Sequence, residues 1–379
     1  MKLFLIAGEA SGDKLGAALM IGLKELMPEV EFEGVGGPLM EAQGLQSQFP
    51  MDELSVMGLV EILPKYRHLM RRIEETAQAV LASKPAALIT IDSPDFSLRV
   101  AKRVKAASDI RTVHYVAPTV WAWRSGRAEK MSKFIDHVLA LFPFEPPYME
   151  EHGMRCDFVG HPVVSDPKAN WAETDLFCHA NYFTGFKMCV LLGSRSGEIR
   201  RLAPIFGQAL ELIAYEFTDF DAVIPVAPGK ADLVQEVTKD WFRPPVLTDH
   251  SFNKASVFAA CDVALAASGT VSLELAHAGL PMVIAYDMNW LSRQMIKRML
   301  KIDTVTLVNL VSETRAVPEF LGAECTPQNI ANAVIALRDD EAKRTAQEAA
   351  MALTMKRLGD GGDPPGLRAA LAVLDGISM

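Results

Sequence analysis

The chain has 379 residues, 50% of them hydrophobic and 22% charged, a composition typical of a folded protein with two α/β domains. Its formal net charge of −9 argues against a general nucleic-acid binder, and no apolar run reaches the roughly 18 residues of a membrane span. The five scattered cysteines include no Cys-x-x-Cys pair, which argues against a zinc site or a disulfide framework and favours a cytoplasmic protein.

Strand-like apolar runs alternate with amphipathic, helix-like segments along the first part of the chain. These runs cover residues 2–8, 31–37, 86–92, 111–118 and 137–144. The alternation predicts an α/β fold with a parallel sheet and helices on both faces. Prolines and polar residues at 160–175 predict a linker, so we expect a first domain over residues 1–162.

The alternation restarts after the linker. Its strand-like runs lie within residues 187–199, 220–228, 245–249, 261–270, 280–288 and 303–311. We therefore expect a second doubly wound domain over residues 163–345, facing the first across a cleft. Residues 346–379 are expected to form a helical tail, interrupted at 359–366, that packs back on the first domain or is exchanged in a dimer.

A glycine-containing loop ends the first strand-like run. Gly8, Gly12 and Gly16 stand four apart, whereas the dinucleotide fingerprint is G-x-G-x-x-G. Glu9 and Asp13 add carboxylates where a pyrophosphate requires positive charge or free amides. This loop is therefore not predicted to bind a nucleotide, and close packing of strand on helix is the alternative role of Gly8 and Gly16.

Two stretches of the chain interleave basic residues with bulky apolar ones. The first stretch contains Val56, Met57, Leu59, Val60, Ile62, Leu63, Lys65, Arg67, His68, Arg71 and Arg72, and the second covers residues 289–302. Such a pattern is typical of a segment lying on an anionic bilayer, and core-facing helices with solvated basic sides produce it too. Because both stretches occur in an acidic chain, we expect the first to form a membrane patch.

Asp92 ends the third strand-like run, and Asp95 follows three residues later. A carboxylate at the carboxyl end of a strand can act as a general base, and an Asp at a helix start is most often a cap. We expect Asp92 to be the base and Asp95 to be the cap. The next run is followed by residues that can line a sugar or phosphate pocket or simply pack together: Trp121, Trp123, Arg124 and Arg127.

The second domain contains the stronger nucleotide signal. Ser268, Gly269 and Thr270 stand between a buried run and a helix, where free amides and the helix dipole suit a diphosphate. Glu274, one turn into that helix, is placed to accept hydrogen bonds from ribose hydroxyls. An ordinary capped helix after a strand is the alternative.

A second loop of this domain consists of Gly193, Ser194 and Arg195, after its first strand-like run. Ligands of doubly wound sheets bind at the carboxyl ends of the strands, so both loops can contact one ligand. Arg195 can neutralise the charge of a departing phosphate.

A set of motifs in one order covers nearly the whole chain: AGEASGD, GVGGPLM, LSVMGLVEIL, IDSPDF, HYVAPTVWAWR, FPFE, FVGHP, GSRSGEI and ASGTVSLE. Together they resemble the lipid-A-disaccharide synthase family, inverting glycosyltransferases of Gram-negative lipid A assembly. The resemblance implies the two-domain glycosyltransferase-B fold, peripheral association with the inner membrane, and dimers built by exchanging C-terminal parts. It also implies transfer of 2,3-diacylglucosamine from UDP to the 6-hydroxyl of 2,3-diacylglucosamine 1-phosphate, releasing UDP.

The resemblance implies roles for individual residues. Asp92 is the expected general base, and Arg195, Glu274 and Asn309 are expected in donor binding or catalysis. Glu9 lies in the loop on the acceptor side, so the acceptor-binding candidates are Gly8, Glu9, Ser11, Gly12, Asp13, Trp123 and Arg124. The chain departs from the family at Leu192 and Val308, where the family usually has proline.

The expected mechanism is a direct displacement with inversion. Asp92 removes the acceptor proton, the hydroxyl attacks the anomeric carbon opposite UDP, and Arg195 with the helix at Gly269 stabilises the leaving diphosphate. No cofactor and no metal is expected. The alternatives are a UDP-sugar 2-epimerase and a protein that binds a nucleotide sugar without turnover.

Overall fold

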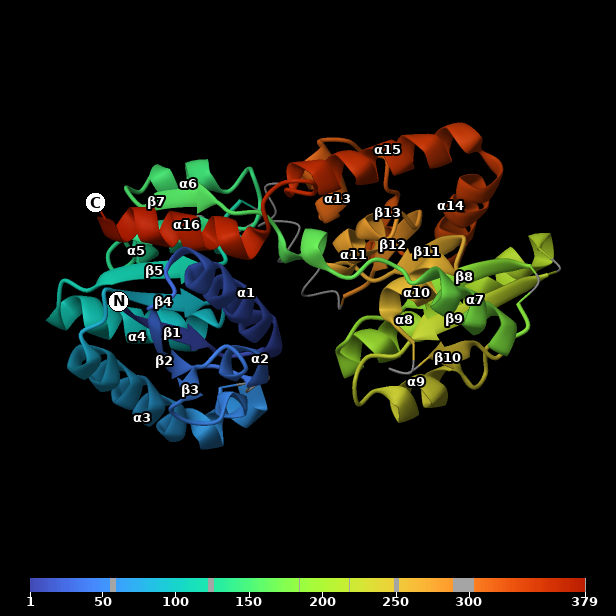
Figure 1. Cartoon of the computed structure of the whole chain (residues 1–379). Coiled ribbons are helices and arrows are strands. Elements are labelled where there is room, and N and C mark those ends of the chain that lie inside the picture. Colours follow the sequence, from blue (N-terminus) through green and yellow to red (C-terminus); the bar gives the residue numbers. More distant parts are fainter. Residues whose placement is uncertain are drawn as a thin grey trace. The chain divides into compact units, whose positions relative to one another are not determined.

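The computed structural model describes residues 1–54, 59–121, 126–183, 185–217, 219–248, 252–288 and 303–378, with the backbone alone over 59–65. The chain divides into two compact units (Figure 1). The N-terminal unit comprises residues 1–165 together with 361–379, and the C-terminal unit comprises residues 166–360. Each unit is built on one parallel sheet.

A seven-stranded sheet forms the centre of the N-terminal unit, and its described pairings are all parallel. In sheet order its strands are β3 (Gln46–Ser47), β2 (Glu31–Val35), β1 (Lys2–Ala7), β4 (Ala87–Ile91), β5 (Arg111–Tyr115), β6 (His137–Ala140) and β7 (Arg155–Phe158). The chain winds outward in both directions from β1 and β4. Both central strands are almost wholly buried, as is typical of parallel strands covered on two faces.

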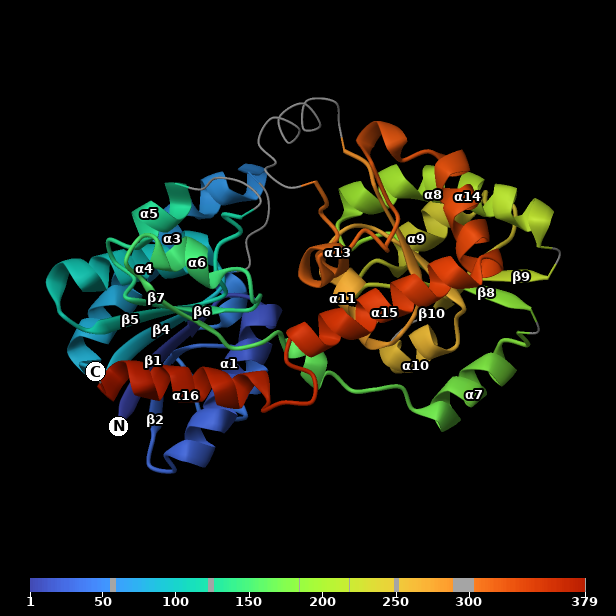
Figure 2. The same ribbon diagram turned by 90° about the horizontal axis from the view of Figure 1, so that it is seen from above.

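Helices cover both faces of this sheet (Figures 1 and 2). One face carries α1 (Ala10–Leu26) and α16 (Pro365–Ser378), and the other carries α3 (Leu59–Ser83) and α4 (Pro94–Ala107). The short helices of this unit are α2 (Pro38–Glu41), α5 (Gly126–Met131) and α6 (Pro146–Glu150).

The helix α16 packs on α1 of the same chain. A Cβ atom at Gly22 of α1 would lie 2.7 Å from the carbonyl oxygen of Gly366, so the two helix backbones cross in close contact. Arg155 of β7 also forms an ion pair of 2.6 Å with Asp375 of α16. Within this chain, the part of the predicted tail that forms α16 therefore packs on the N-terminal unit.

The C-terminal unit is built on a six-stranded sheet, again with parallel pairings. In sheet order its strands are β10 (Val246–Thr248), β9 (Phe220–Pro225), β8 (Phe186–Leu191), β11 (Val263–Ala266), β12 (Met282–Tyr286) and β13 (Glu319–Leu321). Its helices are α7 (Trp171–Ala180), α8 (Ser196–Glu216), α9 (Ala231–Thr238), α10 (Lys254–Ala259), α11 (Val271–His277), α13 (Leu307–Ser312), α14 (Pro327–Asp339) and α15 (Glu341–Arg357).

The helix α15 continues past residue 345, where the sequence predicted the end of the second domain. It packs on α11 and α13, and its buried Gln347 accepts a hydrogen bond of 2.6 Å from the backbone N–H of Met282 in β12. Residues 346–360 therefore belong to the C-terminal unit, and only α16 returns to the first. The predicted α/β class with two doubly wound parallel sheets is confirmed. None of the described helices has the length and apolarity needed to cross a membrane.

Candidate active site

Each sheet reverses its direction of winding between two neighbouring strands. In the N-terminal unit these strands are β1 and β4, followed by Glu9 and Asp92. In the C-terminal unit they are β8 and β11, followed by residues 192–195 and 267–270. Ligands of doubly wound sheets bind outside the carboxyl ends of the strands at such switch points. Within each unit, the topology brings together loops that the sequence singled out.

The carboxyl group of Glu9 lies close enough to that of Asp92 to affect its ionisation. Burial, followed by the hydrogen bond and negative charge of Glu9, raises the pKa of Asp92 to about 6. Asp92 can therefore accept a proton at neutral pH while being a stronger base than an exposed aspartate.

The backbone around Asp92 is in an unusual conformation. Asp92 and Ser93 have φ angles of +49° and +45°, and Val116, which follows the neighbouring strand β5, has a φ of +85°. A positive φ is costly for a β-branched residue, and such strain often accompanies functional sites. The turn lets the backbone N–H of Ser93 donate a 2.9 Å hydrogen bond to the Asp92 carboxylate. Asp95 lies in the first turn of α4, and Ser93 occupies the N-cap position predicted for it.

The glycines of the first loop allow close packing. A Cβ atom at Gly8 would lie 2.5 Å from the Oγ of Ser93, and one at Gly16 would lie 2.5 Å from the sulfur of Met40. Gly12 is less restricted, with 3.3 Å to the carbonyl oxygen of Ile91. The packing alternative therefore accounts for Gly8 and Gly16, and Gly8 also makes room for the turn that carries Asp92.

Asp13 is part of the framework, which corrects its expected role in acceptor binding. Its carboxylate is 2% exposed. It accepts hydrogen bonds of 2.9–3.0 Å from the backbone N–H groups of Gly37, Leu39 and Met40, at the start of α2. A buried carboxylate with three backbone donors has no free face for a sugar. In the same loop Ser11 is exposed and Glu9 is partly exposed, so both are accessible to a ligand.

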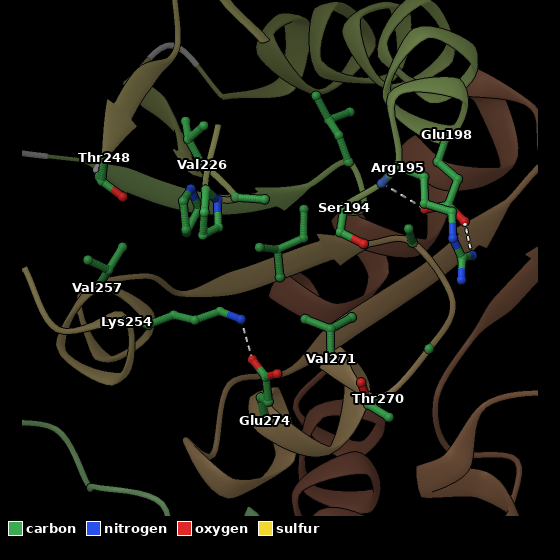
Figure 3. Close-up of a pocket in the computed structure, with 18 of the residues that line it drawn as sticks. Ser194, Arg195, Glu198, Val226, Thr248, Lys254, Val257, Thr270, Val271 and Glu274 are labelled. Carbon is green, nitrogen blue, oxygen red and sulfur yellow. Dashed lines mark hydrogen bonds and ion pairs between the residues drawn. The ribbon is translucent and has the colours of Figure 1, made fainter. Parts of the chain in front are cut away.

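A pocket of about 650 Å³ lies in the C-terminal unit (Figure 3). Its walls include the loop after β8, with Gly193, Ser194 and Arg195, and the loop after β11, with Ser268, Gly269 and Thr270. Glu274 of α11, residues 225–228, residues 252–254 and Val257 form other parts of the lining. The structure thus brings together seven of the eight predicted donor-binding residues in one pocket: Gly193, Ser194, Arg195, Ser268, Gly269, Thr270 and Glu274.

The conformations of two glycines keep this pocket open. Gly269 has a φ of +144°, and no atom lies within 4 Å of the position a Cβ would take, so a ligand can approach its backbone directly. Gly193 has a φ of +92°, and a Cβ there would lie 2.8 Å from a carboxylate oxygen of Glu198. A side chain at either position would require a backbone conformation that L-residues rarely adopt.

Arg195 is the N-cap residue of α8, and its side chain is paired with Glu198. The guanidinium forms an ion pair of 3.0 Å with the Glu198 carboxylate, which also accepts a 3.1 Å hydrogen bond from the hydroxyl of Tyr286. The arginine side chain remains 72% exposed. Its charge can therefore turn toward an anion in the pocket without breaking a buried contact.

Lys254 is a pocket residue that sequence reasoning missed. It is the first residue of α10 and its ammonium forms an ion pair with Glu274 across the pocket (Figure 3). The available signal was the position of "FNK" after the strand-like run 245–249, where Asn253 caps the helix that Lys254 begins.

Asn309, the eighth predicted donor-binding residue, does not line this pocket. Its amide is 1% exposed, donates to the carbonyl oxygen of Val317 at 2.9 Å, and accepts from the N–H of Val317 at 3.0 Å. It also donates to the Thr304 hydroxyl at 3.3 Å. In this structure Asn309 therefore holds the segment 304–317 together.

Glu145 is a second titratable group that sequence reasoning left without a role. It is 2% exposed and lies after β6, at the same edge as Asp92. Its carboxylate accepts hydrogen bonds from the N–H groups of Leu141 and Phe142, both at 3.0 Å, and from the indole N–H of Trp121 at 3.3 Å. Burial raises the pKa of Glu145 to about 7.

Several predicted residues lie outside the described part of the chain. Trp123 and Arg124 fall there, as do Val56, Met57, the side chains of Leu59, Val60, Ile62 and Leu63, and the second basic stretch, 289–302. Arg71 and Arg72 are described. Arg72 contacts Glu53 through two hydrogen bonds of 2.8 and 3.0 Å and lies 4.5 Å from the ring centre of Phe49, whereas Arg71 is exposed.

Solved structures with nucleotide sugars share this fold. UDP-GlcNAc 2-epimerase from Neisseria meningitidis, bound to UDP-GlcNAc, matches with a TM-score of 0.64 and 12% identity over 100% of both chains. MurG from Acinetobacter baumannii matches with a TM-score of 0.56 and 14% identity over 100% of this chain and 99% of its own. At these identities the likeness establishes the fold alone.

The two doubly wound sheets, with a pocket at one switch point and a carboxyl pair at the other, define an α/β protein of the glycosyltransferase-B class. A family profile described as lipid-A-disaccharide synthetase matches residues 3–361. The lipid-A-disaccharide synthase of Ruegeria pomeroyi is 62% identical over 99% of this chain and 95% of its own, and that of Rhodospirillum centenum is 46% identical over 99% and 94%. The chain belongs to the lipid-A-disaccharide synthetase family and is a glycosyltransferase.

Proposed function

We propose that the protein transfers 2,3-diacylglucosamine from UDP-2,3-diacylglucosamine to the 6-hydroxyl of 2,3-diacylglucosamine 1-phosphate (lipid X). The products are lipid A disaccharide 1-phosphate and UDP, and the anomeric carbon is inverted. The observation that carries this proposal is the Asp92–Glu9 pair at the switch point of the N-terminal sheet, in a chain 62% identical to a named lipid-A-disaccharide synthase.

The donor is assigned to the pocket of the C-terminal unit. Its volume of about 650 Å³ is that of a small-molecule site. Backbone amides at Ser268–Thr270 can bind the diphosphate because Gly269 leaves the loop open. Arg195 is exposed beside the same pocket and can offset the negative charge that builds on UDP as the glycosidic bond breaks. Glu274 is assigned to the ribose hydroxyls.

The acceptor is assigned to the N-terminal unit, with Asp92 as the general base. Asp92 takes the proton of the 6-hydroxyl, the oxygen forms its bond to the anomeric carbon, and the bond from that carbon to UDP breaks. Burial and then the neighbouring Glu9 side chain raise the pKa of Asp92 and so make it a stronger base. Ser11, Glu9, Trp123 and Arg124 remain the candidates for holding the acceptor sugar and its phosphate.

Purified enzyme incubated with UDP-2,3-diacylglucosamine alone and with added lipid X tests this reaction. A transferase forms the disaccharide and UDP only when both substrates are present. A 2-epimerase, the alternative that shares this fold, changes the donor sugar without an acceptor. A pure binding protein retains both substrates unchanged. Mass spectrometry of the lipid products separates these three results.

Membrane association is part of the proposal because both substrates carry acyl chains. Drawing a lipid fully into water costs about 0.8 kcal/mol for each exposed CH₂ group. An enzyme that lies on the inner membrane avoids most of this cost, since only the sugar head has to leave the headgroup layer. We assign the contact to the patch of Val56, Met57, Leu59, Val60, Ile62 and Leu63, with Arg71 beside it.

We also propose that two chains can form a homodimer by exchanging residues 361–379. The α1–α16 packing would then form between chains with the same close contact at Gly22 and Gly366. Sedimentation of the full chain, compared with a chain ending at residue 360, measures whether this segment holds two copies together. A full chain that sediments as a monomer contradicts the exchange.

A further inference from the structure

The start of α10 is fixed in position by a neighbouring helix. Glu173 of α7 accepts hydrogen bonds from the backbone N–H of Asn253 at 2.5 Å and from the hydroxyl of Ser256 at 2.9 Å. Asn253 caps α10 by accepting a 3.0 Å hydrogen bond from the N–H of Ala255. The backbone of Lys254 is therefore held firmly at the pocket wall.

The side chain of Lys254 is free to move by comparison. It is 49% exposed and ends in the ion pair with Glu274, with its ammonium 5.4 Å from the ring centre of Phe258. Its four-carbon stem has several rotatable bonds, and an ammonium presents three donors without a fixed plane. Lys254 thus has a fixed backbone and a flexible side chain, which places a positive charge in the pocket.

The charges of the pocket are balanced in pairs. Its described lining contains two cations and two carboxylates, with Arg195 bound to Glu198 and Lys254 bound to Glu274. A diphosphate brings about two negative charges into this balanced set. A cation that leaves its carboxylate for the phosphate oxygens would offset this added negative charge.

We propose that Lys254 is a specificity-determining residue of the donor pocket, which couples recognition of the diphosphate to recognition of the ribose. This inference rests on the proposed function. In this structure Lys254 is paired with the Glu274 carboxylate. When a nucleoside diphosphate enters, the ammonium moves to the phosphate oxygens, and the released carboxylate accepts hydrogen bonds from the ribose hydroxyls. A nucleoside without phosphates has no charge that can draw Lys254 away.

The coupling explains why a lysine suits this position. Glu274 is one turn along α11 from Thr270, so its carboxylate and the phosphate-binding loop lie within the range of one flexible side chain. A uridine competing with Lys254 for Glu274 must break an ion pair to bind. A UDP-sugar replaces that ion pair with contacts from the same ammonium to its own phosphates.

Calorimetric titration of the full chain with UDP and with uridine tests this coupling. The wild type is compared with Lys254→Met, and Lys254→Arg is included because it keeps the charge. In Lys254→Met we expect the Kd of UDP to rise about tenfold, the effect of one charge-assisted hydrogen bond. The Kd of uridine is expected not to rise, because Glu274 is already free. Lys254→Arg should retain most of the UDP affinity.

Two results would overturn the inference. If Lys254→Met weakens UDP and uridine by the same factor, Lys254 only holds Glu274 in place. If it leaves the Kd of UDP unchanged, the ammonium does not bind phosphate. Lys230→Met is the matched control, because Lys230 contacts the Ser196 hydroxyl at 3.1 Å but does not line the pocket. It removes the same charge and should leave the ratio of the two affinities unchanged.

The wild-type titration separates this inference from the proposed function. A wild-type chain that fails to bind UDP removes the donor pocket from the proposed function altogether. If the wild type binds UDP and Lys254→Met discriminates UDP from uridine as well as the wild type does, only the role of Lys254 is overturned. The donor pocket then remains part of the proposed function.

Discussion

Glu9 and Asp92 follow two neighbouring parallel strands, and the Glu9 side chain, after burial, raises the pKa of the Asp92 carboxyl. The strands β1 and β4 pair residue by residue up to Ala7 and Ile91, so the residues that follow them emerge at one edge of the sheet. A negative charge beside the partly buried Asp92 makes the ionisation of Asp92 less favourable. We expect the acid–base catalysis of this protein to depend on this pair.

Asp92→Asn is expected to lower kcat by about 10²–10⁴-fold, because an amide cannot accept the proton of the acceptor hydroxyl. The donor pocket lies in the other unit, so the Kd of UDP should be unchanged. Asp95→Asn is the matched control, since Asp95 is exposed in the first turn of α4. An Asp92→Asn enzyme with near wild-type turnover would falsify the assignment of the base.

The pH dependence of kcat/KM should show an acid limb near pH 6. Activity falls below that pH because Asp92, with its pKa raised to about 6, becomes protonated and can no longer act as a base. In Glu9→Gln the negative charge beside Asp92 is absent, so the limb should move to lower pH. Glu145 has a pKa of about 7, close to that of Asp92. If the acid limb does not move in Glu9→Gln, the limb reports a group other than Asp92.

Asp92→Asn should also make the protein more stable at neutral pH. The folded-state pKa of Asp92 lies above the value of about 3.9 expected in the unfolded chain, so the ionised carboxyl destabilises the fold above that pH. The penalty grows between about pH 4 and pH 6 and is full above pH 6. Removing it should raise the free energy of unfolding by about 1–2 kcal/mol at pH 7, discounted for partial exposure. Asparagine also tolerates the positive φ at this position.

The measurement for this stability prediction is thermal unfolding of Asp92→Asn and wild type at pH 7 and pH 4. The difference in Tm should be present at pH 7 and should be small at pH 4, where Asp92 is protonated in the folded chain and about half protonated in the unfolded chain. An equal difference at both values would show that the asparagine acts through packing and not through charge.

Asp13→Asn is expected to lower stability without changing acceptor affinity. One oxygen of the amide cannot replace a carboxylate that accepts from three backbone N–H groups at the start of α2. The expected loss is about 2–3 kcal/mol, the cost of weakening buried charge-assisted hydrogen bonds. Chemical denaturation gives the stability, and the KM for lipid X gives the acceptor affinity. A raised KM with unchanged stability would return Asp13 to the acceptor site.

The membrane patch is tested by changing Met57, Leu59 and Ile62 together to Ser. These side chains lie outside the described structure, and the prediction depends on their pattern in the sequence. The variant should remain folded, lose binding to anionic vesicles, and turn over long-chain substrates more slowly. A variant that unfolds, or that keeps its vesicle affinity, shows that these residues form a core and not a membrane patch.

Two neighbouring arginines provide the comparison for this experiment. Arg71 is exposed, and its replacement by Gln should weaken vesicle binding by about 1 kcal/mol while leaving stability unchanged. Arg72 is hydrogen-bonded to Glu53. The Arg72 guanidinium, and to a smaller extent His68, lowers the pKa of the Glu53 carboxyl to about 2. Arg72→Gln should therefore affect folding more than vesicle binding.

The sequence predicts the switch-point loops well because their position follows from local pattern. Continuous apolar runs identify buried parallel strands, and the residues after each run must emerge at the carboxyl edge. This reasoning finds Asp92 after β4 and Gly269 after β11 without knowledge of the whole fold. It also predicts the α/β class, since alternation of strands and helices leaves few other arrangements.

The local sequence pattern does not show which distant segments contact each other. Asp13 and Gly37 are hydrogen-bonded because α2 starts beside α1, and nothing in the local pattern shows that the carboxylate is already used. The pairing of Lys254 with Glu274 likewise depends on where α10 and α11 lie around one pocket. Asn309 illustrates the same limit, since its amide is used by Val317 on a neighbouring segment.

The return of α16 to the N-terminal unit has a consequence for synthesis on the ribosome. Residues 166–360 are an insertion within a domain that starts at residue 1 and ends with residues 361–379. The face of α1 that contains Gly22 is therefore exposed to water until the last helix has been made, after the whole inserted domain. The inserted domain, being continuous, can complete its core first. A chain that stops before Pro365 contains the whole C-terminal unit, while its N-terminal unit lacks α16.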